Sequence, residues 1–162
     1  MERLAFPLAL LLSMALALPF AGCGSGESAE IAAPPRLTKA QLAHRMTVIC
    51  EEHTAKKFTE IGRWEKKQGL PLSSKGDVPD AQWERELMQI QIPDVREAIR
   101  ELERLQPPKA QEKTFEAFLK AAEYGVEFSK KDPSWYPTGY TEPFSKAKAL
   151  SWKLGTAVCI QA

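Results

Sequence analysis

The sequence predicts an all-helical protein: an antiparallel four-helix bundle closed by one disulfide and preceded by a signal peptide and a flexible linker. Three observations support this prediction. Apolar residues recur at three- and four-residue steps in four segments, which is the period of amphipathic helices. No segment has the alternation of a strand. Two cysteines, Cys50 and Cys159, lie near the two ends of the helical part.

The N-terminus has the features of a targeting segment. Residues 4–18 are almost purely apolar, but a transmembrane helix needs about 20 such residues. A short apolar run followed by small residues is typical of a secretory signal peptide. We therefore expect an exported protein, on the outer side of the cytoplasmic membrane or in the periplasm or outer membrane.

The end of this segment, Phe20-Ala21-Gly22-Cys23, resembles the lipobox of bacterial lipoproteins. The resemblance implies cleavage before Cys23 and lipid attachment to its sulfur, although Phe20 replaces the usual aliphatic residue. The alternative is simple secretion, with cleavage after Ala17 or Ala21. The predicted organisation is a lipoprotein signal peptide over 1–22, a lipidated linker over 23–36 and a helical bundle domain over 37–162.

The four helices follow from their end signals. Thr38 is a good N-cap and Gly69 a stop signal, so the first helix should run from 38 to 68. The second should span 80–105, with a kink or restart at Pro93. A turn at Pro107-Pro108 precedes the third, 108–131. The fourth should start near 141 or 143 and end near 159.

The core is expected to form from one stripe on each helix, with Lys57 interrupting the first. The inward residues should be Leu42, Met46, Ile49, His53, Ile61 and Trp64; Trp83, Leu87, Ile90, Ala98, Leu102 and Leu105; Phe115, Phe118, Leu119, Ala122 and Val126; and Phe144, Ala147, Leu150, Leu154 and Val158.

The disulfide prediction rests on the three cysteines of the chain. If Cys23 carries lipid, Cys50 and Cys159 remain, and an exported compartment permits a disulfide. In an up-and-down bundle, Cys50 would lie roughly 27 Å above the lower end of the first helix and Cys159 roughly 24 Å up the fourth. The alternative is two buried free thiols.

Several short motifs also carry a family resemblance. They are Leu37-Thr38-Lys39-Ala40, Ile49-Cys50, Leu105-Gln106-Pro107-Pro108, and Gly155 before Cys159. Together they resemble small bacterial lipoproteins with a helical two-cysteine domain, over most of residues 37–160. This chain differs at Met46-Thr47-Val48, where that group often has Ala-Asp-Ala, and at Leu154, where an aromatic is common. The resemblance implies a helical fold, export and a disulfide, and it implies no activity.

The sequence offers little evidence of chemistry. A formal net charge of +1 gives no pull toward nucleic acid. No nucleophile elbow, free exported cysteine or phosphate-binding loop is evident, so we expect no catalytic residues, no cofactor and no enzyme activity. His44 and His53 are nine residues apart and cannot share a metal ion. With no second ligand visible, His53 is expected to be a core residue beside a polar partner, and no metal site is predicted.

The loops are more suggestive of binding. Helix order predicts that loops 69–79 and 132–140 share the membrane-distal end. Trp135, Tyr136 and Tyr140 would form a candidate binding surface there for an envelope protein or a glycan; the alternative is that they seal the end of the bundle. The leading hypothesis is a lipid-anchored cell-envelope module with a binding or structural role. The alternative is an envelope enzyme or a cofactor- or metal-binding bundle whose site forms only in three dimensions.

Overall fold

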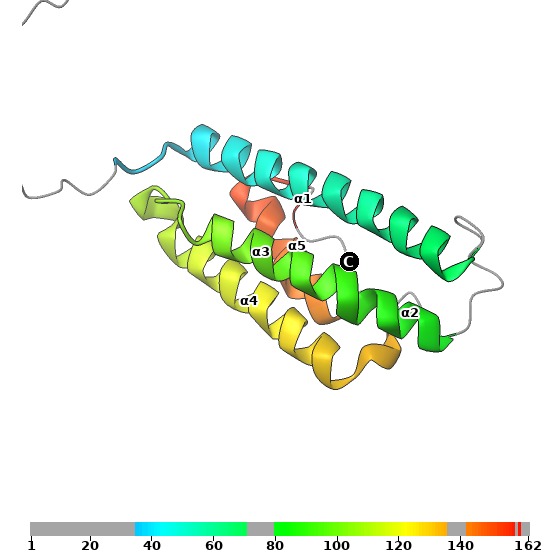
Figure 1. Ribbon diagram of the computed structural model, residues 1–162. Helices are drawn as coiled ribbons and strands as arrows, with labels where there is room; N and C mark the ends of the chain where they lie inside the picture. Colours follow the sequence, from blue (N-terminus) through cyan, green and yellow to red (C-terminus); the bar gives the residue numbers. More distant parts are fainter. Residues whose placement is uncertain (1–34, 71–79, 136–141, 158, 160–162) are drawn as a thin grey trace, which may run out of the picture. The chain divides into compact units, whose positions relative to one another are not determined.

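The computed structural model describes residues 35–70, 80–135, 142–157 and 159, all of which belong to one compact unit, Ala33–Ala162. The regular structure of these residues is helical throughout, which confirms the predicted all-α class (Figure 1). The elements are α1 (Lys39–Gln68), α2 (Asp80–Glu86), the π-helical turn η1 (Leu87–Gln91), α3 (Ile92–Leu102), the 3-10 turn η2 (Lys109–Gln111), α4 (Glu112–Lys131), the 3-10 turn η3 (Pro133–Trp135) and α5 (Glu142–Leu154).

The predicted end signals of α1 are confirmed. The Thr38 hydroxyl accepts a hydrogen bond from the Gln41 amide at 3.2 Å, and the Gln41 side chain accepts one from the Thr38 amide at 2.9 Å. This reciprocal pair is a capping box. Gly69 follows the last turn with φ of 69°, a left-handed conformation that glycine adopts without steric cost.

The second helical segment is continuous through Pro93, with the π turn η1 immediately before it. The Ile92 amide donates to the Leu87 carbonyl, five residues back. Proline lacks an amide hydrogen and its ring crowds the preceding turn, so a widened turn accommodates it where we had expected a kink or restart. The π turn contains one more residue than an α-helical turn, so it also changes which side chains face inward. Glu86, Gln91 and Asp94 are buried there.

The core lies where α3 meets α1 and α4, and where α5 meets α4. The contact between α4 and α5 is close at Gly125. A Cβ atom at that position would lie 2.4 Å from the Phe144 ring and 2.9 Å from the Pro143 carbonyl oxygen. The predicted stripes supply most of the buried apolar residues, including Leu42, Met46, Leu87, Leu102, Phe115, Phe118, Val126, Phe144 and Leu154.

The last helix ends earlier than predicted. α5 stops at Leu154, and Gly155 has φ of 92°, so the chain turns out of the helix at the only residue type that adopts this conformation readily. Thr156 then shares a 3.0 Å hydrogen bond with Thr47 on α1. The expected helix end near 159 was therefore wrong.

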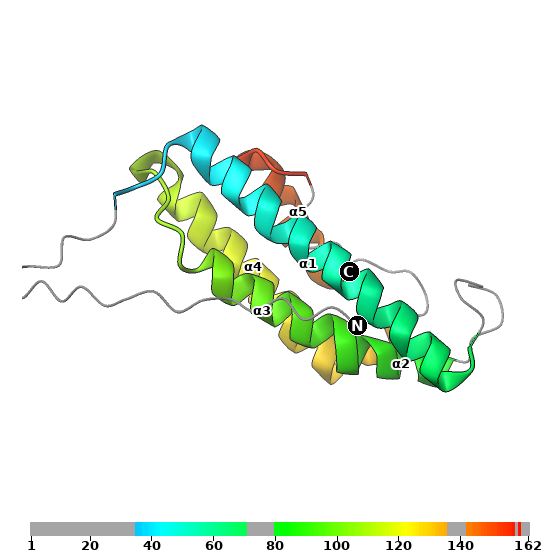
Figure 2. The same ribbon diagram turned by 45° about the horizontal axis from the view of Figure 1, so that its top comes forward.

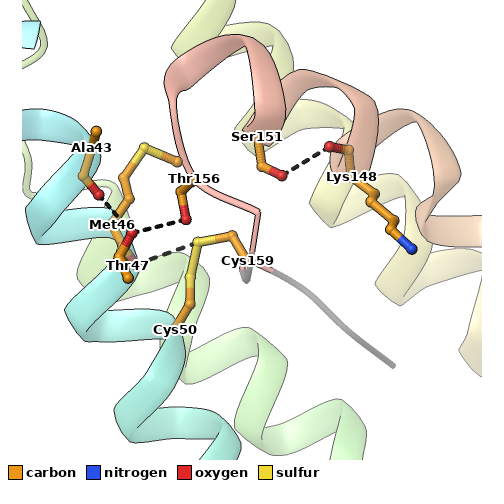
Figure 3. Close-up of a disulfide and its surroundings, with 8 residues drawn as sticks. All are labelled: Ala43, Met46, Thr47, Cys50, Lys148, Ser151, Thr156 and Cys159. Atoms are coloured by element: carbon orange, nitrogen blue, oxygen red, sulfur yellow. Dashed lines mark hydrogen bonds between the residues drawn. A yellow bond between two sulfur atoms is a disulfide. The ribbon is translucent and has the colours of Figure 1, made fainter.

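The turn at Gly155 nevertheless leads the chain to its disulfide partner. Cys50 and Cys159 are bonded, as Figure 3 shows, and their Cα atoms are 5.0 Å apart. Both residues are buried, and the Cys159 sulfur lies 3.4 Å from the Met46 carbonyl oxygen. The pairing predicted from the sequence is thus the one in the structure, although Cys159 approaches α1 from a tail and not from a helix.

The start of α1 and the proline turn lie at the same end of the domain (Figures 1 and 2). The Leu37 amide donates to the Gln106 carbonyl at 2.8 Å. Arg36 donates to the Pro107 carbonyl and pairs with Glu112, each at 3.0 Å. The residues directly before α1 are therefore hydrogen-bonded to the turn between α3 and α4.

Candidate functional site

A group of polar side chains is buried between α1 and α3, among residues that are otherwise apolar. His53 on α1 is 7% exposed and Asp94 on α3 is 5% exposed. The His53 Nδ1 atom and the Asp94 Oδ1 atom are 2.8 Å apart, a hydrogen-bond distance. His53 is thus a core residue beside a polar partner, as predicted. Asp94 reaches it because the π turn sets the phase of α3.

Two further carboxylates of α3 surround the imidazole. Glu101 Oε1 lies 3.5 Å from His53 Nε2, so each ring nitrogen faces an acidic residue. The nearest ligand atoms of His53, Asp94 and Glu97 all lie within 4.8 Å of one another. Glu97 and Glu101 are partly exposed, so this side of the group is open to solvent.

Glu97 is paired with Lys56, which precedes the buried Lys57 on α1. The Lys56 ammonium donates a hydrogen bond to Glu97, and both side chains are 45% exposed. That hydrogen bond lowers the pKa of the Glu97 carboxyl and raises the pKa of Lys56. Lys56 therefore holds a positive charge at the solvent edge of the polar group.

Lys57, the second lysine, places its side chain in the interior, between α1 and α3. Its side chain is buried, and that burial lowers the pKa of its ammonium, while the negative charges of Asp94 and Glu86 act in the opposite direction. Glu86 is itself 2% exposed and accepts a hydrogen bond from Gln91 at 2.9 Å. The interior thus places one lysine between two acidic side chains, Asp94 and Glu86.

A small void adjoins this group and the disulfide. It measures about 20 Å³ and is lined by Cys50, His53, Thr54, Lys57, Asp94, Val95 and Ala98. A single water needs roughly 10–15 Å³ on this measure, whereas sites for organic ligands are typically about 300–1,000 Å³. The void can hold a water or an ion and is too small for a metabolite.

A larger groove lies on the outside, between α3 and α4. It measures about 430 Å³ and is lined by Arg96, Ile99, Arg100, Glu103, Glu123, Val126 and Glu127. Ile99 and Val126 are buried and form an apolar floor. Two arginines and Glu103 lie on the α3 side and two glutamates on the α4 side, and Arg96 pairs across the groove with Glu127 at 2.7 Å.

Trp135, which was predicted to lie on an exposed aromatic surface, is buried in the structure. Its side chain is 8% exposed and packs edge-on against Phe144, with ring centroids 6.2 Å apart. Trp135 therefore belongs to the core, as in the alternative in which the aromatics seal the end of the bundle. Tyr136, Tyr140 and the lipidation residue Cys23 lie outside the described residues.

The polar residues that line the interior were missed from the sequence. Asp94 and Glu97 follow Pro93, where only a kink or restart was expected, and Lys57 was expected to interrupt the apolar stripe. Two signals could have found them. A lysine in phase with buried residues indicates that acidic partners lie nearby, and a proline within a helix indicates a change in the helical phase. His44 is exposed and lies on a different face of α1 from His53, as expected.

Comparison with protein-family models, curated proteins and solved structures found no match to this chain. Among the described residues, no helix has the length and apolar character needed to cross a membrane. The function must therefore be argued from the geometry and the sequence.

Proposed function

We propose that the protein is a lipid-anchored helical module of the cell envelope that binds another envelope protein through the groove between α3 and α4. In this proposal the helices form an antiparallel four-helix bundle, tethered through residues 23–36 to a lipid on Cys23. The groove is the observation that carries the binding role. It combines an apolar floor with charged rims, the composition of a site for a protein segment.

The charges of the groove favour a particular kind of partner. Arg100 on the α3 side and Glu123 on the α4 side would orient a segment with an acidic group on one side and a basic group on the other, whereas Arg96 and Glu127 already pair with each other. Ile99 and Val126 offer apolar contact between these rims. Such a segment gains both orientation and buried apolar area, whereas a nucleic acid would meet repulsion from the acidic rim.

Export is supported by two independent features. The first is the N-terminal segment ending in Ala21-Gly22-Cys23. The second is the Cys50–Cys159 disulfide, because such bonds persist mainly in oxidising compartments. The 20 Å³ void is too small for an organic substrate, so the proposal assigns no organic-substrate chemistry to the polar group beside it.

Site-specific photocrosslinking in living cells tests the binding role. A photoreactive residue at Arg100, on the groove, should capture one defined envelope protein. The same residue at Arg63, exposed on α1 away from the groove, is the matched control and should not. Arg96→Glu should reduce the capture from position 100. Equal capture from both positions, or none from position 100, would refute the groove as the binding surface.

Fractionation tests the anchor. The wild-type protein should be recovered with membranes, and Cys23→Ser should release it or leave an uncleaved precursor of higher mass. If the Cys23→Ser protein stays in the membrane fraction at unchanged mass, the lipid anchor is refuted.

A further inference from the structure

We propose that His53, Asp94 and Glu97 bind one divalent transition-metal ion, of which zinc is the type. Their nearest ligand atoms lie within 4.8 Å of one another, and two of the three side chains are buried. The sequence argued against a metal at His53 because no second ligand was visible. The structure provides two, from the neighbouring helix α3.

The donor set matches zinc chemistry. Imidazole nitrogen and carboxylate oxygen both bind Zn²⁺ at about 2.0–2.2 Å, and a three-ligand site keeps a position open for water. Ligand atoms on one tetrahedral ion are then about 3.3–3.6 Å apart. The separation of up to 4.8 Å therefore requires Glu97, the most exposed of the three, to move inward. The two carboxylates together neutralise a divalent cation.

The surroundings provide two further features of a metal site. A metal-bound histidine usually donates its other ring N–H to a carboxylate, which fixes the ring, and Glu101 lies 3.5 Å from His53 Nε2. In addition, His53 and Asp94 line the 20 Å³ void, which provides room for one ion or its bound water. Glu101 is an observation independent of the three ligands, and the void lies beside two of them, His53 and Asp94.

Two lysines compete with the ion. Lys56 pairs with Glu97, and its half-exposed side chain must swing into solvent before Glu97 can bind metal. Lys57 is buried and lines the same void, so its charge weakens binding relative to a site without a lysine. This competition makes a prediction that a purely structural ion pair does not make: removing the Lys56 ammonium should raise the affinity for metal.

Calorimetric titration of the metal-free, disulfide-bonded full chain with Zn²⁺ tests the site, and the visible absorption of added Co²⁺ reports its coordination. We expect one ion per chain. Glu97→Gln should weaken binding at least about tenfold, as loss of supporting groups does in other sites, and Lys56→Ala should strengthen it several-fold. Lys66→Ala, exposed on α1, and Glu103→Gln, exposed directly after α3, are the matched controls and should leave binding unchanged.

Because His53 is buried, His53→Ala can also disturb the fold, so the half-exposed Glu97 and Lys56 carry the decision. Circular dichroism should show the same helix content in all four variants. Absence of Zn²⁺ and Co²⁺ binding in the wild type, binding that Glu97→Gln does not weaken, or binding that Lys56→Ala does not strengthen would each overturn the proposal. The crosslinking result at Arg100 is independent of these outcomes.

Discussion

Lys57 shows how a single residue departs from the amphipathic pattern of its helix. It lies in phase with His53 and is buried beneath the surface of α1. A buried ammonium is costly unless opposite charges surround it, and here Asp94 and Glu86 supply them. The three charges stabilise one another, so removing one leaves the others buried without a compensating charge.

The first prediction concerns these three charges. Lys57→Met keeps the length of the side chain but removes the cation, which leaves Glu86 and Asp94 as buried charges without it. The free energy of unfolding should fall by about 3 kcal/mol, the cost typical of breaking a buried pair. The double variant Lys57→Met/Glu86→Gln should lose less than the sum of the two single variants.

Urea denaturation of the four proteins measures this double-mutant cycle. Lys120→Met, exposed on α4, is the control and should change stability by less than about 0.5 kcal/mol. Strictly additive losses in the double variant would contradict the coupling between Lys57 and Glu86.

At the scale of the helices, the sequence predicted best what is determined locally. Thr38 and Gly69 act within one turn of α1, and the structure places its ends where they indicate. The early end of α5 and the π turn before Pro93 depend on tertiary structure: Gly155 turns toward α1, and the widened turn places Asp94 opposite His53. Residues such as Asp94 therefore could not be assigned to a site from the pattern of one helix.

The second prediction concerns the contact between α4 and α5. Glycine to alanine within a helix normally stabilises by roughly 0.5–1 kcal/mol. Gly125→Ala should do the reverse, by about 1–3 kcal/mol, because the new Cβ atom would lie 2.4 Å from the Phe144 ring and 2.9 Å from backbone at Pro143. Thermal denaturation followed by circular dichroism measures the change.

Gly62→Ala is the matched control, since it lies inside α1 with no atom within 4 Å of the new Cβ position. It should stabilise the protein. If both variants shift the thermal transition upward, the close packing of α5 on α4 at Gly125 is wrong.

At the scale of the whole molecule, the disulfide joins the first helix to the tail after the last one. It spans a sequence separation of 109 residues, which greatly restricts the unfolded chain. The third prediction is that Cys50→Ala/Cys159→Ala folds to the same helix content but loses up to about 4–5 kcal/mol of stability. Denaturation of this variant beside oxidised and reduced wild type checks it; equal stability of all three would contradict the role of the bond.

The fourth prediction concerns the distal aromatics. Trp135 packs against Phe144 in the core, so Trp135→Ala should destabilise the domain by about 3–5 kcal/mol, as for other large buried aromatics. Trp152→Ala, at an exposed tryptophan of α5, is the control and should change stability little. A stable Trp135→Ala protein would restore this residue to the candidate binding surface.

Mass spectrometry of the native protein tests most directly the proposal that a lipid on Cys23 anchors this helical domain on the outer side of the membrane. The protein should be extracted from the membrane fraction without reduction and analysed intact and after proteolysis. The account predicts a chain that begins at a diacylated Cys23, with the peptides containing Cys50 and Cys159 linked to each other. A soluble, unlipidated chain that begins at Leu18 or Gly22, or one that retains residues 1–22, would contradict it.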